Sequence, residues 1–270
     1  MYRTEAFTEN RSGALVYMTA PGLAARHAFT TRYGGVSEGI YASLNLSMTV
    51  GDDPGLVSEN CRILRSALGI PDGKLVFSRQ IHGRTVRTCT SSDACPTMAD
   101  VPYEADGIVT AERGLALMIF SADCTPILIS DPATGAVGAV HAGWRGTVAD
   151  IAGEAVLTMS GAFGSRPSDL RAAIGPCISA CCFETGPEVP EAVRSILGPA
   201  AEEYIRPAGR EGKSYVDLKG VNRALLIRAG LRPDMIYVSD ECTVCRCDKY
   251  WSHRATGGRR GSQASVIICG

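Results

Sequence analysis

The sequence is poor in histidine and in aromatic residues, and it carries almost no net charge. Four of its 270 residues are histidine, aromatic residues make up 6%, and the formal net charge is −1. A nearly neutral chain lacks the basic excess that nucleic acids and anionic membrane surfaces attract. No apolar run is long enough to span a bilayer, and the polar N-terminus does not resemble a signal peptide. We therefore expect a cytoplasmic protein with no nucleic-acid partner and no membrane partner.

Two common nucleotide-binding motifs are also missing. The sequence contains neither a G-x-G-x-x-G turn after a strand nor a Walker A loop, which excludes standard dinucleotide and P-loop sites. Cysteine, by contrast, is abundant, with eleven residues. An odd number cannot pair completely within one chain, and in a reducing compartment cysteines serve core packing, metal binding or catalysis.

Short apolar runs bounded by Gly, Pro, Asp or Ser are typical of strands, and several of them lack the alternation of half-exposed strands. We predict strands at Leu75–Arg79, Gly107–Thr110, Leu115–Ser121, Ile127–Ser130, Ala136–Val140, Met235–Val238 and Ala264–Ile268. We predict helices at Pro54–Leu68, Thr147–Met159, Pro187–Leu197 and from Asp217 to Gly230. Strands dominate without regular alternation with helices, which favours a mixed α/β fold. We expect residues 1–270 to form one domain and the protein to be a monomer.

Three residues at predicted strand ends could together bind a metal. His82, Cys124 and His141 all lie where the chain leaves a predicted strand, a common place for functional groups. Each has a simpler interpretation: a single histidine is more often a hydrogen-bonded structural residue, and a single cysteine more often packs in the core. Their wide spacing matches no compact zinc motif, but it permits a site assembled from separate strands. Two imidazoles and one thiolate suit Zn²⁺ and leave a fourth position for water or substrate.

Other polar residues could contact a substrate near these three. Gly143–Thr147 leads into a predicted helix, whose N-terminus and Arg145 could bind an anion, although Arg145 could equally pair with a surface carboxylate. Gln80 precedes His82 by two positions and should share its face of the strand. Arg254 belongs to a basic cluster near the C-terminus that is either a solvated surface or a contact for an anionic group. Cys242, Cys245 and Cys247 form C-x2-C-x-C, a weaker candidate for a second metal.

Several motifs resemble the laccase-domain (polyphenol oxidase-like) family, whose members are known as multicopper polyphenol oxidases or as zinc purine nucleoside phosphorylases. In order, these motifs are Thr31–Ser37, Tyr41–Leu46, Gly51–Asp53, Gln80–Gly83, Ala122–Cys124, His141–Gly146, Ile174–Ile178 and Cys242–Thr243. The resemblance implies back-to-back sheets between helical layers, akin to cysteine-hydrolase toxins. It also implies zinc at His82, Cys124 and His141, and phosphorolysis of adenosine, inosine or methylthioadenosine, with adenosine deamination as a second activity.

The resemblance also suggests further roles in the site. Nucleoside and phosphate are then the expected substrates, with Cys124, His82, His141 and Arg145 at the reacting centre. We expect substrate contacts from Arg32, Asn45, Gln80 and Arg254, with phosphate held by Arg145 or Arg32. Near the C-terminus the match is looser, because Gly258–Ser262 does not align directly with the Thr-Gly-Arg segment of the family. Four isolated histidines are too few for a blue site plus a three-copper cluster, which argues against multicopper chemistry.

Two other functions fit the same residues. In a cysteine hydrolase or amidase acting on peptidoglycan precursors, Cys124 would be the nucleophile and His141 or His82 the base, with no metal required. A non-catalytic module that binds a metal or a nucleotide would show no turnover of any nucleoside.

Overall fold

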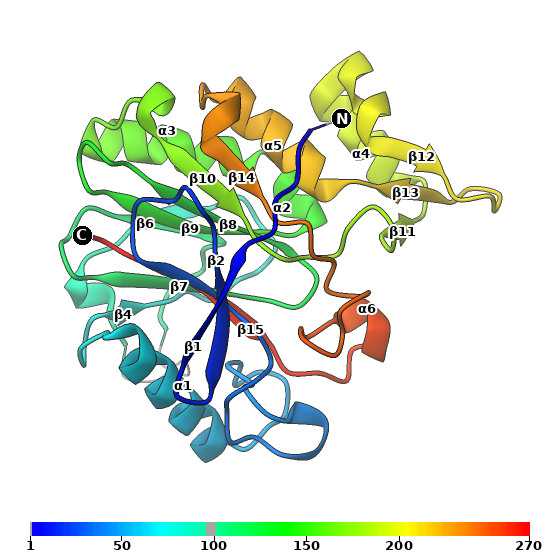
Figure 1. Ribbon diagram of the computed structural model, residues 1–270. Helices are drawn as coiled ribbons and strands as arrows, with labels where there is room; N and C mark the ends of the chain where they lie inside the picture. Colours follow the sequence, from blue (N-terminus) through cyan, green and yellow to red (C-terminus); the bar gives the residue numbers. More distant parts are fainter. Residues whose placement is uncertain (1, 96–100) are drawn as a thin grey trace.

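The computed structural model describes residues 2–95 and 101–270, and two six-stranded sheets form its centre (Figure 1). The first sheet is antiparallel except at its β7–β4 edge, where the two strands run parallel. Its strands, in spatial order, are β1 (Thr8–Ser12), β2 (Leu15–Thr19), β3 (His27–Thr30), β15 (Gln263–Ile268), β7 (Ala116–Ser121) and β4 (Leu75–Val76).

The second sheet is mixed, with parallel pairs at both edges and antiparallel pairs in the centre. Its strands, in spatial order, are β14 (Ile236–Val238), β10 (Arg171–Ile174), β8 (Thr125–Ser130), β9 (Val137–Ala142), β6 (Gly107–Thr110) and β5 (Val86–Thr88). All residues of β6, β8 and β9 are buried. Their apolar character without alternation is what strands covered on both faces require.

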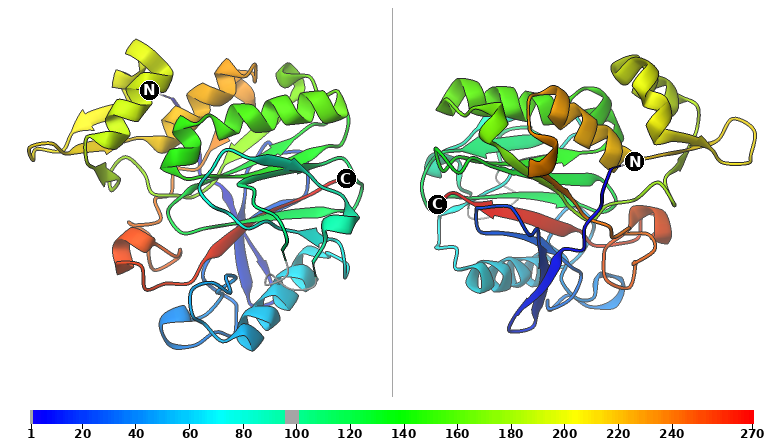
Figure 2. Two further views of the ribbon diagram at one scale, coloured as in Figure 1. Left: turned by 180° about the vertical axis from the view of Figure 1, so that it is seen from behind. Right: turned by 45° about the horizontal axis from the view of Figure 1, so that its top comes forward.

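The two sheets pack face to face, and each is covered by helices on its outer side (Figures 1 and 2). Alternate residues of β7 divide between two cores: Leu117 and Ile119 pack toward the second sheet, whereas Met118 packs with Leu64 of α1 (Pro54–Leu68). The helices α3 (Ile151–Phe163) and α5 (Leu218–Arg228) cover the second sheet. The predicted mixed α/β class is confirmed, while the likeness to cysteine-hydrolase toxins stays a prediction.

A small third sheet extends to one side of this body (Figure 2). It contains β11 (Glu184–Thr185), β13 (Ser214–Val216) and β12 (Ile205–Pro207), and α4 (Glu188–Leu197) packs against it. The remaining helices are short: α2 (Trp144–Val148), α6 (His253–Thr256) and the 3₁₀ turns Gly39–Tyr41, Ser91–Asp93, Pro167–Asp169, Gly198–Tyr204 and Pro233–Met235. Among the described residues, we find no helix with the length and apolar character that a transmembrane span needs.

The main error of the sequence analysis concerns the predicted helix Thr147–Met159. The chain breaks this segment into α2 and α3 at Asp150, which adopts a left-handed conformation with φ of 62°. Asp150 is itself the N-cap of α3, because its carboxylate accepts a hydrogen bond from Gly153 N. Thr147, the first residue of the predicted helix, does not cap it, because its hydroxyl donates to the carbonyl of Ala142.

Candidate metal centre

Three separate elements bring His82, Cys124 and His141 to one point between the two sheets. His82 lies in the loop that follows β4, and His141 lies in β9. Cys124 lies in the connection between β7 and β8, where the chain passes from the first sheet to the second. One imidazole nitrogen from each histidine and the Cys124 Sγ all lie within 4.8 Å of one another.

The separations within this set suit a bound metal ion. Cys124 Sγ lies 3.8 Å from His82 Nε2, and the two imidazole rings stand nearly perpendicular with centroids 4.8 Å apart. A tetrahedral zinc ion with usual Zn–N and Zn–S bonds places an N and an S ligand about 3.6 Å apart. His141 is buried, Cys124 is half-buried and His82 is exposed, so one side of the set faces solvent. The donor set therefore fits an ion with an open coordination position.

The buried Asp106, which sequence patterns did not indicate, bonds to His141 and to the loop that carries His82. Its Oδ1 accepts hydrogen bonds from His82 N at 2.9 Å and from His141 Nδ1 at 2.8 Å. Its Oδ2 accepts from the backbone N–H groups of Ile81 at 3.0 Å and Gly83 at 2.8 Å. A carboxylate that takes the Nδ1 proton fixes the ring and leaves Nε2 free to bind a metal.

The charges of the site support one another. Burial would raise the pKa of the Cys124 thiol, but the charge of His141 and hydrogen bonds from His141 and His82 outweigh it and lower that pKa to about 6. Burial would lower the pKa of His141, yet Cys124 and Asp106 raise it to about 9. Burial opposes ionisation of Asp106 too, but His141 and the backbone N–H groups of Gly83 and Ile81 lower its pKa. Without a metal, these two pKa values favour a thiolate–imidazolium pair of Cys124 and His141 at neutral pH.

Gly143 leaves room for the ligands. A Cβ atom there would lie 2.9 Å from the His82 ring and 3.4 Å from Cys124 Sγ. Gly143 is also the N-cap of α2, which has only five residues and can offer little helix dipole to an anion. The predicted companion Arg145 is exposed, and its guanidinium lies over the Trp144 ring at 4.4 Å. The structure therefore gives little support to the predicted anion pocket at Gly143–Thr147.

A cavity of about 600 Å³ opens beside the three ligands. Phe77 and Phe120 line this cavity, and their rings meet edge to face with centroids 6.2 Å apart. Ser121 adds a buried hydroxyl that has no hydrogen-bond partner among the described residues. The volume and the mixed lining are those of a site for a small organic molecule.

Arg260 is the arginine that reaches this cavity from the C-terminal segment. Its Nη1 donates to Ser262 Oγ at 2.6 Å, whereas its buried Nε has no partner in the described part of the chain. Burial lowers the pKa of Arg260, although the nearby Asp123 and Cys124 raise it. Arg260 belongs to the segment Gly258–Ser262, which matches the family's Thr-Gly-Arg segment only loosely. It is the residue of this segment whose arginine side chain lines the cavity.

Two of the predicted substrate-binding residues, Gln80 and Asn45, already have protein partners, and Asn45 is not part of the cavity lining. The Gln80 amide donates to the carbonyl of Phe120 at 2.8 Å and accepts from Phe120 N at 2.7 Å, although Gln80 still lines the cavity. Gln80 and His82 line the same cavity, as their spacing predicts, although His82 has a left-handed backbone with a φ of 62°. Asn45 is fully buried, and its side chain bonds to Ser47, Asp52 and Ser262.

The other two predicted contacts lie outside the cavity lining. Arg32 donates to the carbonyls of Ala42 and Cys247, and its guanidinium lies over Trp251 at 4.0 Å. Arg254 is exposed and donates from Nη1 to the Cys182 carbonyl at 3.2 Å.

Asp123, next to Cys124, bonds to residues of two later loops. Its carboxylate accepts from Thr243 Oγ1 at 2.6 Å, Ser252 Oγ at 3.0 Å and Arg254 N at 2.6 Å. The carboxylate therefore holds two later loops against the Cys124 turn.

Known proteins resemble the chain over almost its whole length. Residues 26–270 match the family described as multi-copper polyphenol oxidoreductase laccase. The chain is 36% identical over 266 residues to a Geobacillus stearothermophilus protein named purine nucleoside phosphorylase YlmD, covering 97% of each. It is 40% identical over 256 residues to a Deinococcus radiodurans protein named purine nucleoside phosphorylase, covering 94% of this chain and 92% of that one. The crystal structure of YlmD from Geobacillus stearothermophilus matches with a TM-score of 0.92 and 35% identity, covering 98% and 99% of the two chains. The chain therefore belongs to the multi-copper polyphenol oxidoreductase laccase family, among relatives named purine nucleoside phosphorylase.

Proposed function

We propose that the protein is a zinc-dependent purine nucleoside phosphorylase that cleaves adenosine, inosine and methylthioadenosine with phosphate. The observation that carries this proposal is the set of His82, Cys124 and His141 at the edge of a cavity of about 600 Å³. The names of the relatives support the same activity. In this reaction a phosphate oxygen bonds to C1′ of the ribose, and the purine leaves with the electrons of the glycosidic bond.

The donor chemistry supports zinc and argues against several copper ions. Of the four histidines, His27 is buried elsewhere and bonds to the backbone of Ala20 and Ala25. His253 begins α6 and is exposed, so two histidines remain for the site. A blue site and a three-copper cluster need more ligands than this set provides. Two imidazoles and a thiolate with one open position are instead a known catalytic zinc set, and the ion supplies Lewis acidity there when bound.

The cavity wall suggests how the substrates bind. Phe77 and Phe120 offer apolar surface for the purine, and the unpartnered Ser121 hydroxyl can bond to a polar atom of the nucleoside. Arg260 lines the cavity, and its buried Nε bonds to no other described residue, which supports a role in binding phosphate. We assign phosphate to Arg260 because Arg145 and Arg32 do not line the cavity.

Adenosine deamination at the same cavity is the proposed second activity. It replaces the C6 amino group of the purine with oxygen from water and releases ammonia. Ammonia release should therefore not depend on phosphate, whereas base release should. This difference separates the two reactions in one preparation.

The test is a nucleoside panel with and without phosphate, with products resolved by chromatography. We expect free base from the zinc-loaded protein only when phosphate is present. Cys124→Ala should lower this rate by more than about 100-fold, beyond the usual effect of residues behind a metal ligand. Cys61→Ala, which alters a half-buried thiol of α1, is the matched control and should remain active. A Cys124→Ala protein that lost no zinc and kept full activity would refute the proposal.

One observation favours a second candidate, a cysteine amidase. The lowered pKa of Cys124 and the raised pKa of His141 favour a thiolate–imidazolium pair without a metal, which is the activated state that such hydrolases need. This alternative predicts a metal-free protein that is fully active on an amide of a peptidoglycan precursor and inactive on nucleosides. The phosphorylase proposal predicts that chelation abolishes activity.

A further inference from the structure

Four cysteines gather in a second cluster, which the C-x2-C-x-C motif only partly indicated. Cys181 and Cys182 follow β10, and Cys242 and Cys245 follow β14. Their four Sγ atoms lie within 4.8 Å of one another, and all four are free thiols. Cys247, the third cysteine of the motif, does not belong to this group. The other two cysteines, Cys181 and Cys182, come from a loop some sixty residues earlier in the chain.

The distances in the cluster match those of thiolates around one ion. Cys181 Sγ lies 3.6 Å from Cys182 Sγ and 3.6 Å from Cys245 Sγ, and Cys182 Sγ lies 3.5 Å from Cys245 Sγ. A tetrahedral zinc ion with Zn–S bonds of about 2.3 Å places sulfurs about 3.8 Å apart. A disulfide requires about 2.05 Å. The cluster therefore has the spacing of a tetrathiolate site and not that of a cystine.

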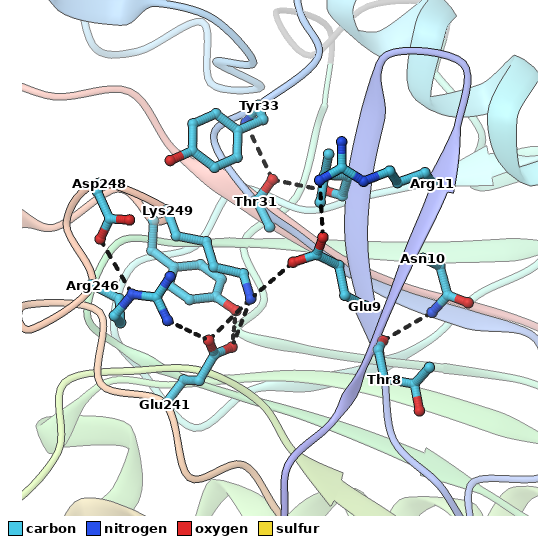
Figure 3. Close-up of polar contacts among 12 residues, drawn as sticks. Thr8, Glu9, Asn10, Arg11, Thr31, Tyr33, Glu241, Arg246, Asp248 and Lys249 are labelled. Carbon is cyan, nitrogen blue, oxygen red and sulfur yellow. Dashed lines mark hydrogen bonds and ion pairs between the residues drawn. The ribbon is translucent and has the colours of Figure 1, made fainter.

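The loop that carries Cys242 and Cys245 is rigidly anchored, which prepares two of the ligands. The Glu241 carboxylate accepts from Lys249 Nζ at 3.0 Å and from Arg246 Nη1 at 3.3 Å (Figure 3). It also accepts from the Tyr250 hydroxyl. The buried Lys219 Nζ donates to the Glu241 carbonyl at 2.8 Å. The backbone immediately before Cys242 is thus held from both sides.

The second loop is fixed in a similar way and carries positive charge nearby. The Cys242 sulfur accepts a hydrogen bond from Ser179 N at 3.4 Å, which joins the two loops. Arg206 donates to the Ala180 carbonyl at 2.9 Å, and Arg254 donates to the Cys182 carbonyl. Four thiolates around a divalent ion carry a net charge of −2, which these two guanidinium groups offset.

We propose that Cys181, Cys182, Cys242 and Cys245 bind one Zn²⁺ in a closed structural site, separate from the His82 centre. Four protein ligands fill the tetrahedral coordination sphere, so the ion has no position for substrate. Its role is to join the loops after β10 and β14. The second of these loops continues into Thr243, which bonds to Asp123 beside Cys124.

Metal analysis of the purified protein tests this site without any activity assay. We expect two zinc ions per chain in the parent protein and one in a Cys181→Ser, Cys245→Ser double variant. Cys247→Ser is the matched control, because it removes a neighbouring exposed thiol outside the cluster, and it should keep two. Cys124→Ala should lose the other ion and keep the one in the cluster. These reciprocal losses separate this proposal from the proposed function.

Cobalt substitution of the parent protein decides the matter even if the double variant does not fold. Four thiolates around Co²⁺ give strong sulfur-to-metal charge-transfer absorption, far above the contribution of Cys124 alone. We expect this strong band in the parent and in Cys124→Ala. A parent protein with one zinc, which Cys124→Ala loses, and with only the weak band of a single thiolate would overturn the proposal.

Discussion

Replacement of Asp106 by asparagine changes few atoms and should weaken the metal centre sharply. The Asp106 carboxylate accepts four hydrogen bonds, two at each oxygen, from His82 N, His141 Nδ1, Ile81 N and Gly83 N. An asparagine keeps one oxygen, so its NH₂ group must face two N–H donors in either orientation.

The expected size of the effect follows from these lost bonds. Two hydrogen bonds to a charged group, at about 1.5 kcal/mol each, should lower the free energy of unfolding by about 3 kcal/mol. Loss of a carboxylate behind a metal-binding histidine should weaken zinc binding by about 10- to 100-fold. This 10- to 100-fold loss of zinc affinity corresponds to about 1.4–2.8 kcal/mol of binding free energy.

The assay is competition for zinc against a chromophoric chelator, combined with urea unfolding. Both proteins should carry Cys181→Ser and Cys245→Ser, so that only the His82 centre is titrated. Asp131→Asn is the control, since Asp131 is also buried but bonds to Ala133 N and the Thr134 hydroxyl and not to a ligand histidine. If Asp106→Asn bound zinc as tightly as the control, Asp106 would not be orienting His141, and this reasoning would be refuted.

Three further predictions concern the same cavity. Gly143→Ala should lower zinc affinity and reduce the free energy of unfolding by about 1–3 kcal/mol, because its Cβ would crowd the His82 ring. Gly161→Ala, in an open position of α3, should change neither quantity. Chelator competition and urea unfolding measure both quantities, and equal results for the two variants would contradict the crowding at Gly143. In chelator-treated protein, the rate of Cys124 alkylation, measured by peptide mass spectrometry, should rise with pH around a midpoint near 6. The reason is that the thiolate reacts and its pKa is about 6. A midpoint near the ordinary thiol value of about 8.5 would contradict the pairing with histidine. Arg260→Met should raise the KM for phosphate by about 10-fold or more and leave the nucleoside KM unchanged, because a charged hydrogen bond to phosphate is lost. Arg259→Met, which changes an exposed neighbour, should alter neither KM. Equal effects of the two variants would show that Arg260 does not bind phosphate.

Local patterns in the sequence were sufficient for most of the two sheets. The strands β6, β7, β8, β9 and β15 could be predicted because apolar runs with clear borders report burial on both faces. The break at Asp150 could not, because a single residue in a left-handed conformation leaves no periodic signal. The same holds for the left-handed backbone of His82, although Gln80 still lines the same cavity, as predicted.

Contacts between distant segments explain what was missed in the site. Asp106 looks like an ordinary residue before a strand, and its importance arises only when the loop Ile81–Gly83 folds over it. Cys181 and Cys182 likewise gain meaning only beside Cys245, across two loops that the sequence does not link. Residue chemistry made His82, Cys124 and His141 candidates in a chain with four histidines, and the family resemblance implied them as the zinc ligands.

The most direct test of the proposed function identifies the sugar product of inosine cleavage. Phosphorus NMR of the zinc-loaded protein with inosine and phosphate should show ribose 1-phosphate appearing in equal amount to free hypoxanthine, and neither should form with Cys124→Ala. Free ribose in place of ribose 1-phosphate, or unchanged product formation by Cys124→Ala, would contradict phosphorolysis at the His82, Cys124 and His141 centre.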